Sequence, residues 1–199
     1  MSKRPKAKSE THDVKLVLAS SSPRRAELLR NAAIPFTICA VDVAEARRPQ
    51  EWPEDYVRRV AGEKAKAALA RHADKFVLGA DTVVIVEGQV LGKPTDAKDA
   101  SRMLQLLSGG SHLVTTGVCL LGPNVEDTRA ETTTVSFSPL SDQEIADYVA
   151  TGEPMDKAGA YAIQGVASRW VTHLEGCYFN VMGLPVPLVY RMLQQHGVM

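Results

Sequence analysis

The stretch KLVLASSSPRR (residues 15–25) places a short apolar strand directly before a serine-rich turn and the start of a helix. The strand expected over residues 15–19 is mostly apolar and includes a β-branched valine. Ser22 is a favourable N-cap and Pro23 a favourable first helical residue, so a helix is predicted to run from there towards Asn31. The order strand, turn, helix is the first unit of an alternating α/β chain.

The same turn predicts an anion site. A helix N-terminus directs free backbone N–H groups and the positive end of the helix dipole to one point. Arg24 and Arg25 add guanidinium groups, which bind phosphate oxygens in a fork and stay charged at every working pH. Taken alone, residues 22–25 fit an ordinary solvated helix start equally well.

The remaining chain continues the alternation of strands and helices. Asp81 follows an apolar run, and ligands gather at the carboxyl ends of strands in open α/β sheets. Ser141 and Glu144 have the spacing of a capping box. We expect strands over residues 35–41, 76–80, 112–121 and 131–137, a hairpin through residues 87–88, a loop over 42–53, and helices over 54–72, from Thr95 to Leu107, from Ser141 through Tyr148 and over 187–195.

Composition narrows the class of function. A chain of 199 residues with 45% hydrophobic and 23% charged residues fits one globular domain, expected over residues 15–199 after a disordered basic tail over 1–14. Its 23 basic residues balance 23 acidic ones, which argues against a nucleic-acid polymer as partner. No apolar run approaches the roughly 20 residues of a membrane span, and we expect a cytoplasmic protein without disulfides.

The charged side chains suit phosphoryl chemistry. Asp81 can ligate a metal ion or take a proton from water, although in isolation it fits a turn aspartate better, and Glu45 in isolation is a loop charge. Lys64, Lys93 and Lys157 supply compact positive charges. The sequence has no P-loop motif, no histidine spacing typical of a zinc hydrolase and no Gly-x-Ser-x-Gly elbow, which argues against those three classes of enzyme.

Five sequence blocks, in register, resemble the Maf family of nucleotide pyrophosphatases. They are LASSSPRR (residues 18–25), GADTVV (79–84), GKP (92–94), MDKAGAY (155–161) and NVMGLP (180–185), and they span nearly everything after residue 15. The resemblance implies a curved mixed sheet flanked by helices, two lobes around a central cleft, and a homodimer. It also implies hydrolysis of a nucleoside triphosphate to the monophosphate and pyrophosphate.

The resemblance also implies roles for individual residues. Asp81 matches the catalytic proton acceptor and Glu45 its acidic partner, so both become candidate ligands of Mg²⁺, Mn²⁺ or Co²⁺. Lys64 and Lys93 match phosphate-contacting lysines, and Lys157 is expected to bind substrate with them. Ser20, Arg24 and Arg25 fall on the phosphate-binding turn of the family.

Three positions that differ between Maf subfamilies read Arg24, Thr82 and Gln164, a combination similar to the group that acts on dTTP and UTP. Without the resemblance, Gln164 would be interpreted as a strand residue with a solvent-facing amide. Ala44 and Ala162 depart from common members, and Ala162 stands where glycine is usual. Two other functions stay open: an inosine-triphosphate pyrophosphatase, and a nucleotide-binding regulator of cell division without turnover.

Overall fold

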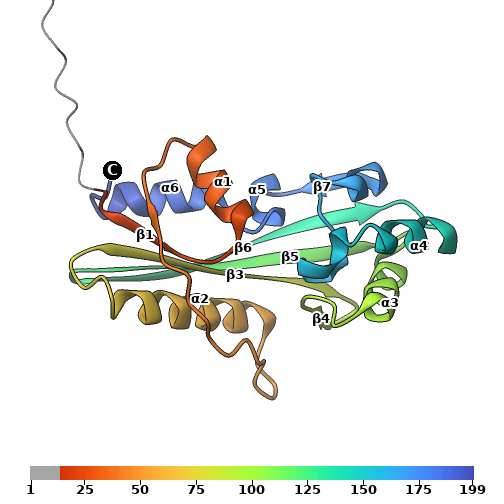
Figure 1. Ribbon diagram of the computed structural model, residues 1–199, viewed down its shortest axis with the longest axis horizontal. Coiled ribbons are helices and arrows are strands. Elements are labelled where there is room, and N and C mark those ends of the chain that lie inside the picture. The colour runs from red at the N-terminus through yellow and green to blue at the C-terminus, as the bar shows by residue number, and fades with distance from the viewer. Residues whose placement is uncertain (1–13) are drawn as a thin grey trace, which may run out of the picture.

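The computed structural model describes residues 14–199, so all but the last residue of the tail predicted over 1–14 lies outside it. Figure 1 shows the order of the elements along the described chain. The strands are β1 (Leu16–Ala19), β2 (Thr37–Ile38), β3 (Phe76–Val86), β4 (Gln89–Leu91), β5 (Ser111–Gly122), β6 (Val125–Phe137) and β7 (Val171–Glu175). The α-helices are α1 (Pro23–Asn31), α2 (Pro53–Leu69), α3 (Ala97–Leu107), α4 (Asp142–Ala150), α5 (Tyr178–Val181) and α6 (Val186–Gln195), and the 3-10 helices are η1 (Glu153–Asp156), η2 (Ala158–Ala160) and η3 (Val166–Trp170).

The described strands form one mixed sheet in the order β2-β1-β3-β5-β6-β7, with β4 pairing beside β3. β1 is parallel to β2 and β3, and the other pairs are antiparallel. β3, β5 and β6, with 11, 12 and 13 residues, run along the long axis of the molecule (Figure 1). These three strands extend through both lobes of the molecule.

The first lobe is a three-layer sandwich built on β1 and on one half of the long strands. Side chains alternate along a strand, so Leu16 and Leu18 pack with α1 and α6 on one face, while Val17 and Ala19 pack with α2 on the other. Glycine lets α2 approach the sheet closely, because a Cβ atom at Gly79 would lie 2.1 Å from the Ala61 carbonyl oxygen. This close approach brings the middle of α2 over β3.

The second lobe packs α3, α4 and the 3-10 helices around the other half of the long strands (Figure 1). Its core contains a cluster of aromatic rings in edge-to-face or tilted contact, formed by Phe137, Tyr148, Tyr161 and Trp170. The predicted α/β class is therefore confirmed, with a mixed sheet, flanking helices and two lobes on either side of a central pocket.

Predictions from local sequence signals agree with the structure better than predictions of strand bounds, which depend on pairing between strands. The capping box at Ser141 is present, and Gly152 follows the end of α4 in a left-handed conformation (φ 75°). The helix predicted to start at Thr95 starts instead at Ala97, because Asp96 caps α3 by accepting a hydrogen bond from the Asp99 amide at 2.8 Å. The strand expected over residues 35–41 shrinks to the two residues of β2, and β6 begins at Val125 rather than Glu131, because its polar first half pairs fully with β5.

Candidate active site

A pocket of about 330 Å³ lies between the two lobes. Its walls come from the β1–α1 turn, α2, the middle of β3, the loop after β4, and the segments around η1 and α5. Five basic side chains line it against three acidic ones, which leaves an excess of two positive charges. The basic residues are Arg24, Arg25, Lys64, Lys93 and Lys157, and the acidic ones are Glu45, Asp81 and Asp156. Such a pocket favours an anionic ligand.

Asp81 lies inside β3 and not after its end, so that part of the prediction is wrong. The polar pair Asp81-Thr82 stays in the strand because its backbone pairs with Gly117 and Thr116 of β5. The neighbouring strand β1 ends opposite Gly79, and in the described chain no strand covers that edge of β3 again until β4 pairs at Val84. The carboxylate therefore reaches a crevice at the carboxyl end of β1.

Alternation along β3 sends neighbouring side chains to opposite faces of the sheet. Asp81 points to the α2 face, where it meets Lys64, and Thr82 points to the α1 face, where it meets Arg25. Both faces open into the same pocket at the uncovered edge of β3. One dipeptide thus contributes to two different parts of the site.

Lys64 joins the two acidic residues. Its Nζ atom lies 2.7 Å from Asp81 Oδ1 and 2.6 Å from Glu45 Oε1. The side chains of Lys64 and Asp81 are 9% and 8% exposed, whereas that of Glu45 is 44% exposed. Tyr56, one turn of α2 after its start, donates a hydrogen bond of 2.8 Å to the Glu45 carbonyl oxygen and so holds the loop that carries Glu45.

The two carboxyl groups differ in basicity. Burial raises the pKa of Asp81 above its ordinary value, and the nearby charges of Lys64 and Arg25 only partly offset this effect. Burial also raises the pKa of Glu45, but this effect is outweighed. The pKa of Glu45 is lowered overall by the hydrogen bond and charge of Lys64 and by the charges of Lys93 and Arg25. Asp81 is therefore the better proton acceptor and Glu45 the more persistent anion.

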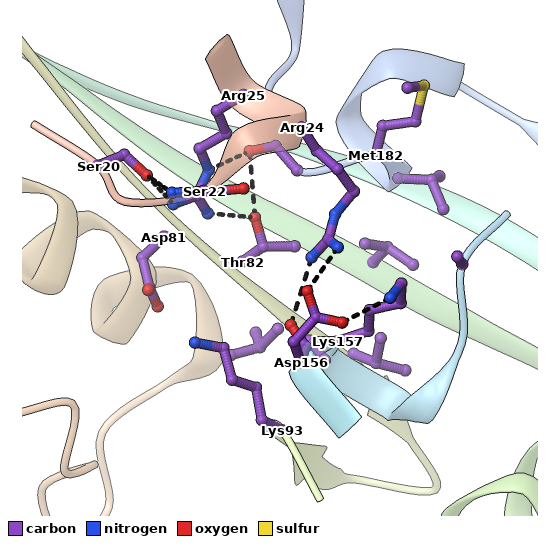
Figure 2. A pocket seen from close by; sticks show the side chains of 18 of the residues that line it. Ser20, Ser22, Arg24, Arg25, Asp81, Thr82, Lys93, Asp156, Lys157 and Met182 are labelled. Carbon is purple, nitrogen blue, oxygen red and sulfur yellow. Dashed lines mark hydrogen bonds and ion pairs between the residues drawn. The ribbon is translucent and has the colours of Figure 1, made fainter. Parts of the chain in front are cut away.

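Arg25 is buried in the wall of the pocket, where it ties three segments together (Figure 2). Its Nε atom donates to the Gly183 carbonyl at 2.8 Å, and its terminal nitrogens donate to the Ala80 carbonyl at 2.9 Å, to Thr82 Oγ1 at 3.0 Å and to Ser20 Oγ at 3.3 Å. Four of the five guanidinium N–H groups are thus used within the protein. Ser20, in turn, accepts a 3.1 Å hydrogen bond from the Ser22 amide, which shapes the turn.

Arg24 and Lys157 converge on Asp156 at the opposite side of the pocket (Figure 2). Arg24 donates to Asp156 Oδ2 at 2.9 Å, and Lys157 Nζ lies 2.5 Å from Asp156 Oδ1. The first contact joins α1 of one lobe to η1 of the other across the pocket. Asp156 belongs to the sequence block at residues 155–161, but no role was predicted for it. Its position directly before Lys157 was the signal that could have identified it.

The structure brings all the predicted site residues to the same pocket. Lys93 is exposed and extends from the loop after β4 towards Asp81 (Figure 2). Gln164 lies exposed in a turn and not in a strand, at the end of the pocket lined by residues 161–164. Tyr56 is another lining residue without a predicted role, because its helical spacing indicates only a core residue.

Comparison with known proteins agrees with this geometry. The family model described as Maf-like protein matches residues 15–196. The chain belongs to the Maf family. The family resemblance carried by the five sequence blocks is therefore confirmed.

The Maf relatives share most of their length with this chain. It is 55% identical over 184 residues to the dTTP/UTP pyrophosphatase of Koribacter versatilis, covering 92% of this chain and 95% of the relative. It is 50% identical over 182 residues to the dTTP/UTP pyrophosphatase of Symbiobacterium thermophilum, covering 92% and 94%. Among solved structures, the Staphylococcus aureus Ham1 protein shares the fold, with a TM-score of 0.50 at 14% identity over 91% of this chain and 98% of that one.

Two further properties concern the described range of this Maf protein. Within residues 14–199, no helix is both long enough and apolar enough to cross a membrane. In the same range no three or more His, Cys, Asp or Glu side chains are grouped so as to hold a metal ion by themselves.

Proposed function

We propose that this protein hydrolyses dTTP and UTP to the nucleoside monophosphate and pyrophosphate. The observation that carries the proposal is the Asp81–Lys64–Glu45 group, whose buried carboxylate of raised pKa lies in a pocket that five basic side chains line. The names of the relatives, dTTP/UTP pyrophosphatase, support the substrate and the reaction.

The triphosphate is proposed to bind between the β1–α1 turn and Lys157. Asp156 accepts from Arg24 and Lys157 with its two carboxylate oxygens, much as a phosphate group would. A substrate phosphate that takes over these donors leaves Asp156, whose side chain is 63% exposed, free to turn to solvent. Arg25 supplies positive charge from within the wall and holds the turn in place, because most of its donors are already used.

The proposed reaction is attack of a water molecule on the α-phosphorus. Asp81 accepts a proton from that water through Oδ2, since Oδ1 is hydrogen-bonded to Lys64. As the new O–P bond forms, the bond between the α-phosphorus and the bridging oxygen breaks, and pyrophosphate leaves with the bonding electrons. Arg24, Lys93 and Lys157 stabilise the charge that develops on it.

A divalent cation fits this arrangement. Two carboxylates meet at one ammonium group, and Mg²⁺ typically binds through one or two carboxylates together with substrate phosphates and water. Asp81 and Glu45 would hold Mg²⁺, Mn²⁺ or Co²⁺, with phosphate oxygens completing the coordination. When bound, the ion would neutralise phosphate charge and polarise the reacting phosphoryl group. We expect a chelator to stop hydrolysis and added Mg²⁺ to restore it.

Gln164 is proposed to read the base. Its amide has one donor and one acceptor side, which complement the carbonyl and N–H edge shared by uracil and thymine. Cytosine presents the reversed pattern, so bound CTP leaves polar groups without partners, at about 1–3 kcal/mol for each buried group. Thr82 and Arg24, the other two subfamily positions, line the same pocket.

The test is a substrate panel with product analysis on the parent enzyme and on Gln164→Ala. We expect UTP and dTTP to be cut to monophosphate and pyrophosphate with kcat/KM well above that for CTP, ITP and 7-methyl-GTP, and the Gln164→Ala variant to lose the preference over CTP. Preference for ITP would indicate an inosine-triphosphate pyrophosphatase, and binding without turnover would indicate a nucleotide-binding regulator. The homodimer and the cytoplasmic location remain predictions, which sedimentation and fractionation would check.

A further inference from the structure

We propose that Tyr148 is a positioning residue for base recognition, acting through Glu153 on the turn that carries Gln164. The inference rests on the proposed function, since it assumes that Gln164 reads the base. Tyr148 belongs to α4, is 1% exposed and does not line the pocket. It therefore cannot touch a nucleotide and can act only through other residues.

The Tyr148 hydroxyl group links two segments of the chain. It donates a 2.8 Å hydrogen bond to Glu153 Oε1 and accepts one of 3.2 Å from the Ala162 amide. The Ala162 amide lies two residues before Gln164, and Glu153 begins η1. A single buried hydroxyl group thus satisfies the backbone of the turn and fixes the carboxylate beside it.

Glu153 holds the other end of the same turn by contact. A Cβ atom at Gly165 would lie 2.1 Å from Glu153 Oε1 and 2.9 Å from Oε2, so the carboxylate lies directly against the backbone there. The backbone of Glu153 is also fixed, because its carbonyl accepts a 2.6 Å hydrogen bond from Lys157 Nζ and its amide donates to Thr151 Oγ1 at 3.1 Å. Gln164 thus lies between two residues whose backbone is held: Ala162, whose amide donates to Tyr148, and Gly165, which contacts the Glu153 carboxylate.

Two further contacts hold Tyr148 in place. Its ring meets the Trp170 ring edge-on at a centroid distance of 5.1 Å, and its carbonyl accepts a 2.6 Å hydrogen bond from Thr151 Oγ1. Loss of the hydroxyl group alone would leave the ring packing in place while two polar groups, the Glu153 carboxylate and the Ala162 amide, lose their partner. The expected result is a turn that samples other positions, with the Gln164 amide no longer fixed against the base.

The proposed phosphate ligands lie on the β1–α1 turn, at Lys93 and at Lys157. Of these, Lys157 contacts Glu153, through the backbone carbonyl, which side-chain substitutions leave in place. Displacement of the turn should therefore reduce discrimination between bases more than it reduces turnover. A purely structural role for Tyr148 would instead lower kcat/KM for all triphosphates by the same factor. The ratio of kcat/KM for UTP to that for CTP separates these two possibilities.

The experiment measures this ratio for the full-length enzyme, for Tyr148→Phe and for the control Tyr190→Phe. Tyr190 is exposed on α6, and its hydroxyl group accepts a 3.1 Å hydrogen bond from Gln194 of the same helix, so the control should match the parent. We expect Tyr148→Phe to lower the ratio of kcat/KM for UTP to kcat/KM for CTP by about fivefold or more, mainly through a higher KM for UTP. A change of about fivefold is the usual effect of losing one hydrogen bond.

A second pair of variants covers the case in which Tyr148→Phe fails to fold. Glu153→Gln keeps an oxygen that can accept from Tyr148 and should keep most of the preference, whereas Glu153→Ala should lose it. An unchanged ratio in Tyr148→Phe, or equal ratios in the two Glu153 variants, overturns the inference while leaving the proposed function intact. A parent enzyme that cuts no triphosphate defeats the proposed function itself, and one that cuts UTP and CTP equally defeats base recognition and this inference together.

Discussion

Replacement of Lys64 by methionine tests how the acidic group of the pocket is held. Methionine keeps an unbranched apolar side chain but removes the ammonium group that contacts Asp81 at 2.7 Å and Glu45 at 2.6 Å. Glu45 is 44% exposed and can be hydrated at little cost. Asp81, which is 8% exposed, is left as a buried carboxylate without its closest partner.

Removal of one partner of a buried ion pair typically costs about 3–5 kcal/mol. We expect a loss near the lower value, about 3 kcal/mol, because the charge of Arg25 still lowers the pKa of Asp81. The pKa of Asp81 is already raised by burial, and it rises further when Lys64 is removed. The folded state then binds protons more tightly than the unfolded state, so the penalty is full above the folded-state pKa and disappears as pH falls towards about 3.9, the unfolded-state value.

The assay is urea denaturation of the parent, Lys64→Met and the double variant Lys64→Met/Asp81→Asn at pH 7.5 and pH 5. The single variant should be destabilised most at pH 7.5, and the double variant should regain much of the loss because the buried charge is gone. A loss below about 1 kcal/mol at pH 7.5, or a double variant no more stable than the single one, would refute the coupling between Lys64 and Asp81.

Two further predictions concern buried basic residues. Burial lowers the pKa of His112 to about 4, so the folded protein keeps this imidazole neutral and loses about 3 kcal/mol of stability as pH falls from about 6.5 to 4. Urea denaturation of His112→Phe across this range should show a shallower dependence on pH, and an unchanged slope would contradict the prediction. Arg25→Lys cannot replace four hydrogen bonds to three segments, so kcat/KM should fall by a similar factor for UTP and CTP, with a lower unfolding midpoint. Full stability with a change in KM alone would instead indicate direct phosphate binding.

Elements of both lobes could be predicted where the causes of the structure are local. The apolar run before Ser20, the proline at the start of α1 and the capping box of α4 each determine structure within a few residues. The position of Asp81 within β3 could not be predicted in this way. A polar dipeptide normally ends an apolar strand, and here the strand continues only because β5 pairs with it from 36 positions away at Gly117.

The residues of the site were largely predictable from family motifs, but their contacts were not. Sequence identified Arg25 as a phosphate ligand, whereas its hydrogen bonds to Gly183 and Ala80 show that it is mostly used within the protein. Tyr148 gave no functional signal at all, because it resembles any buried tyrosine of an amphipathic helix. The positioning role that we propose for it depends on a contact with Ala162, which only the tertiary structure reveals.

The most direct measurement is kcat/KM of Asp81→Asn for UTP at saturating Mg²⁺, with the unfolding midpoint as a control for folding. The asparagine keeps the shape of the side chain but can neither accept the proton nor ligate a cation strongly. We predict a folded protein with kcat/KM reduced by about 100- to 10,000-fold, the usual contribution of general acid–base catalysis. A folded Asp81→Asn enzyme with a rate close to that of the parent would contradict the assignment of Asp81 as the proton acceptor.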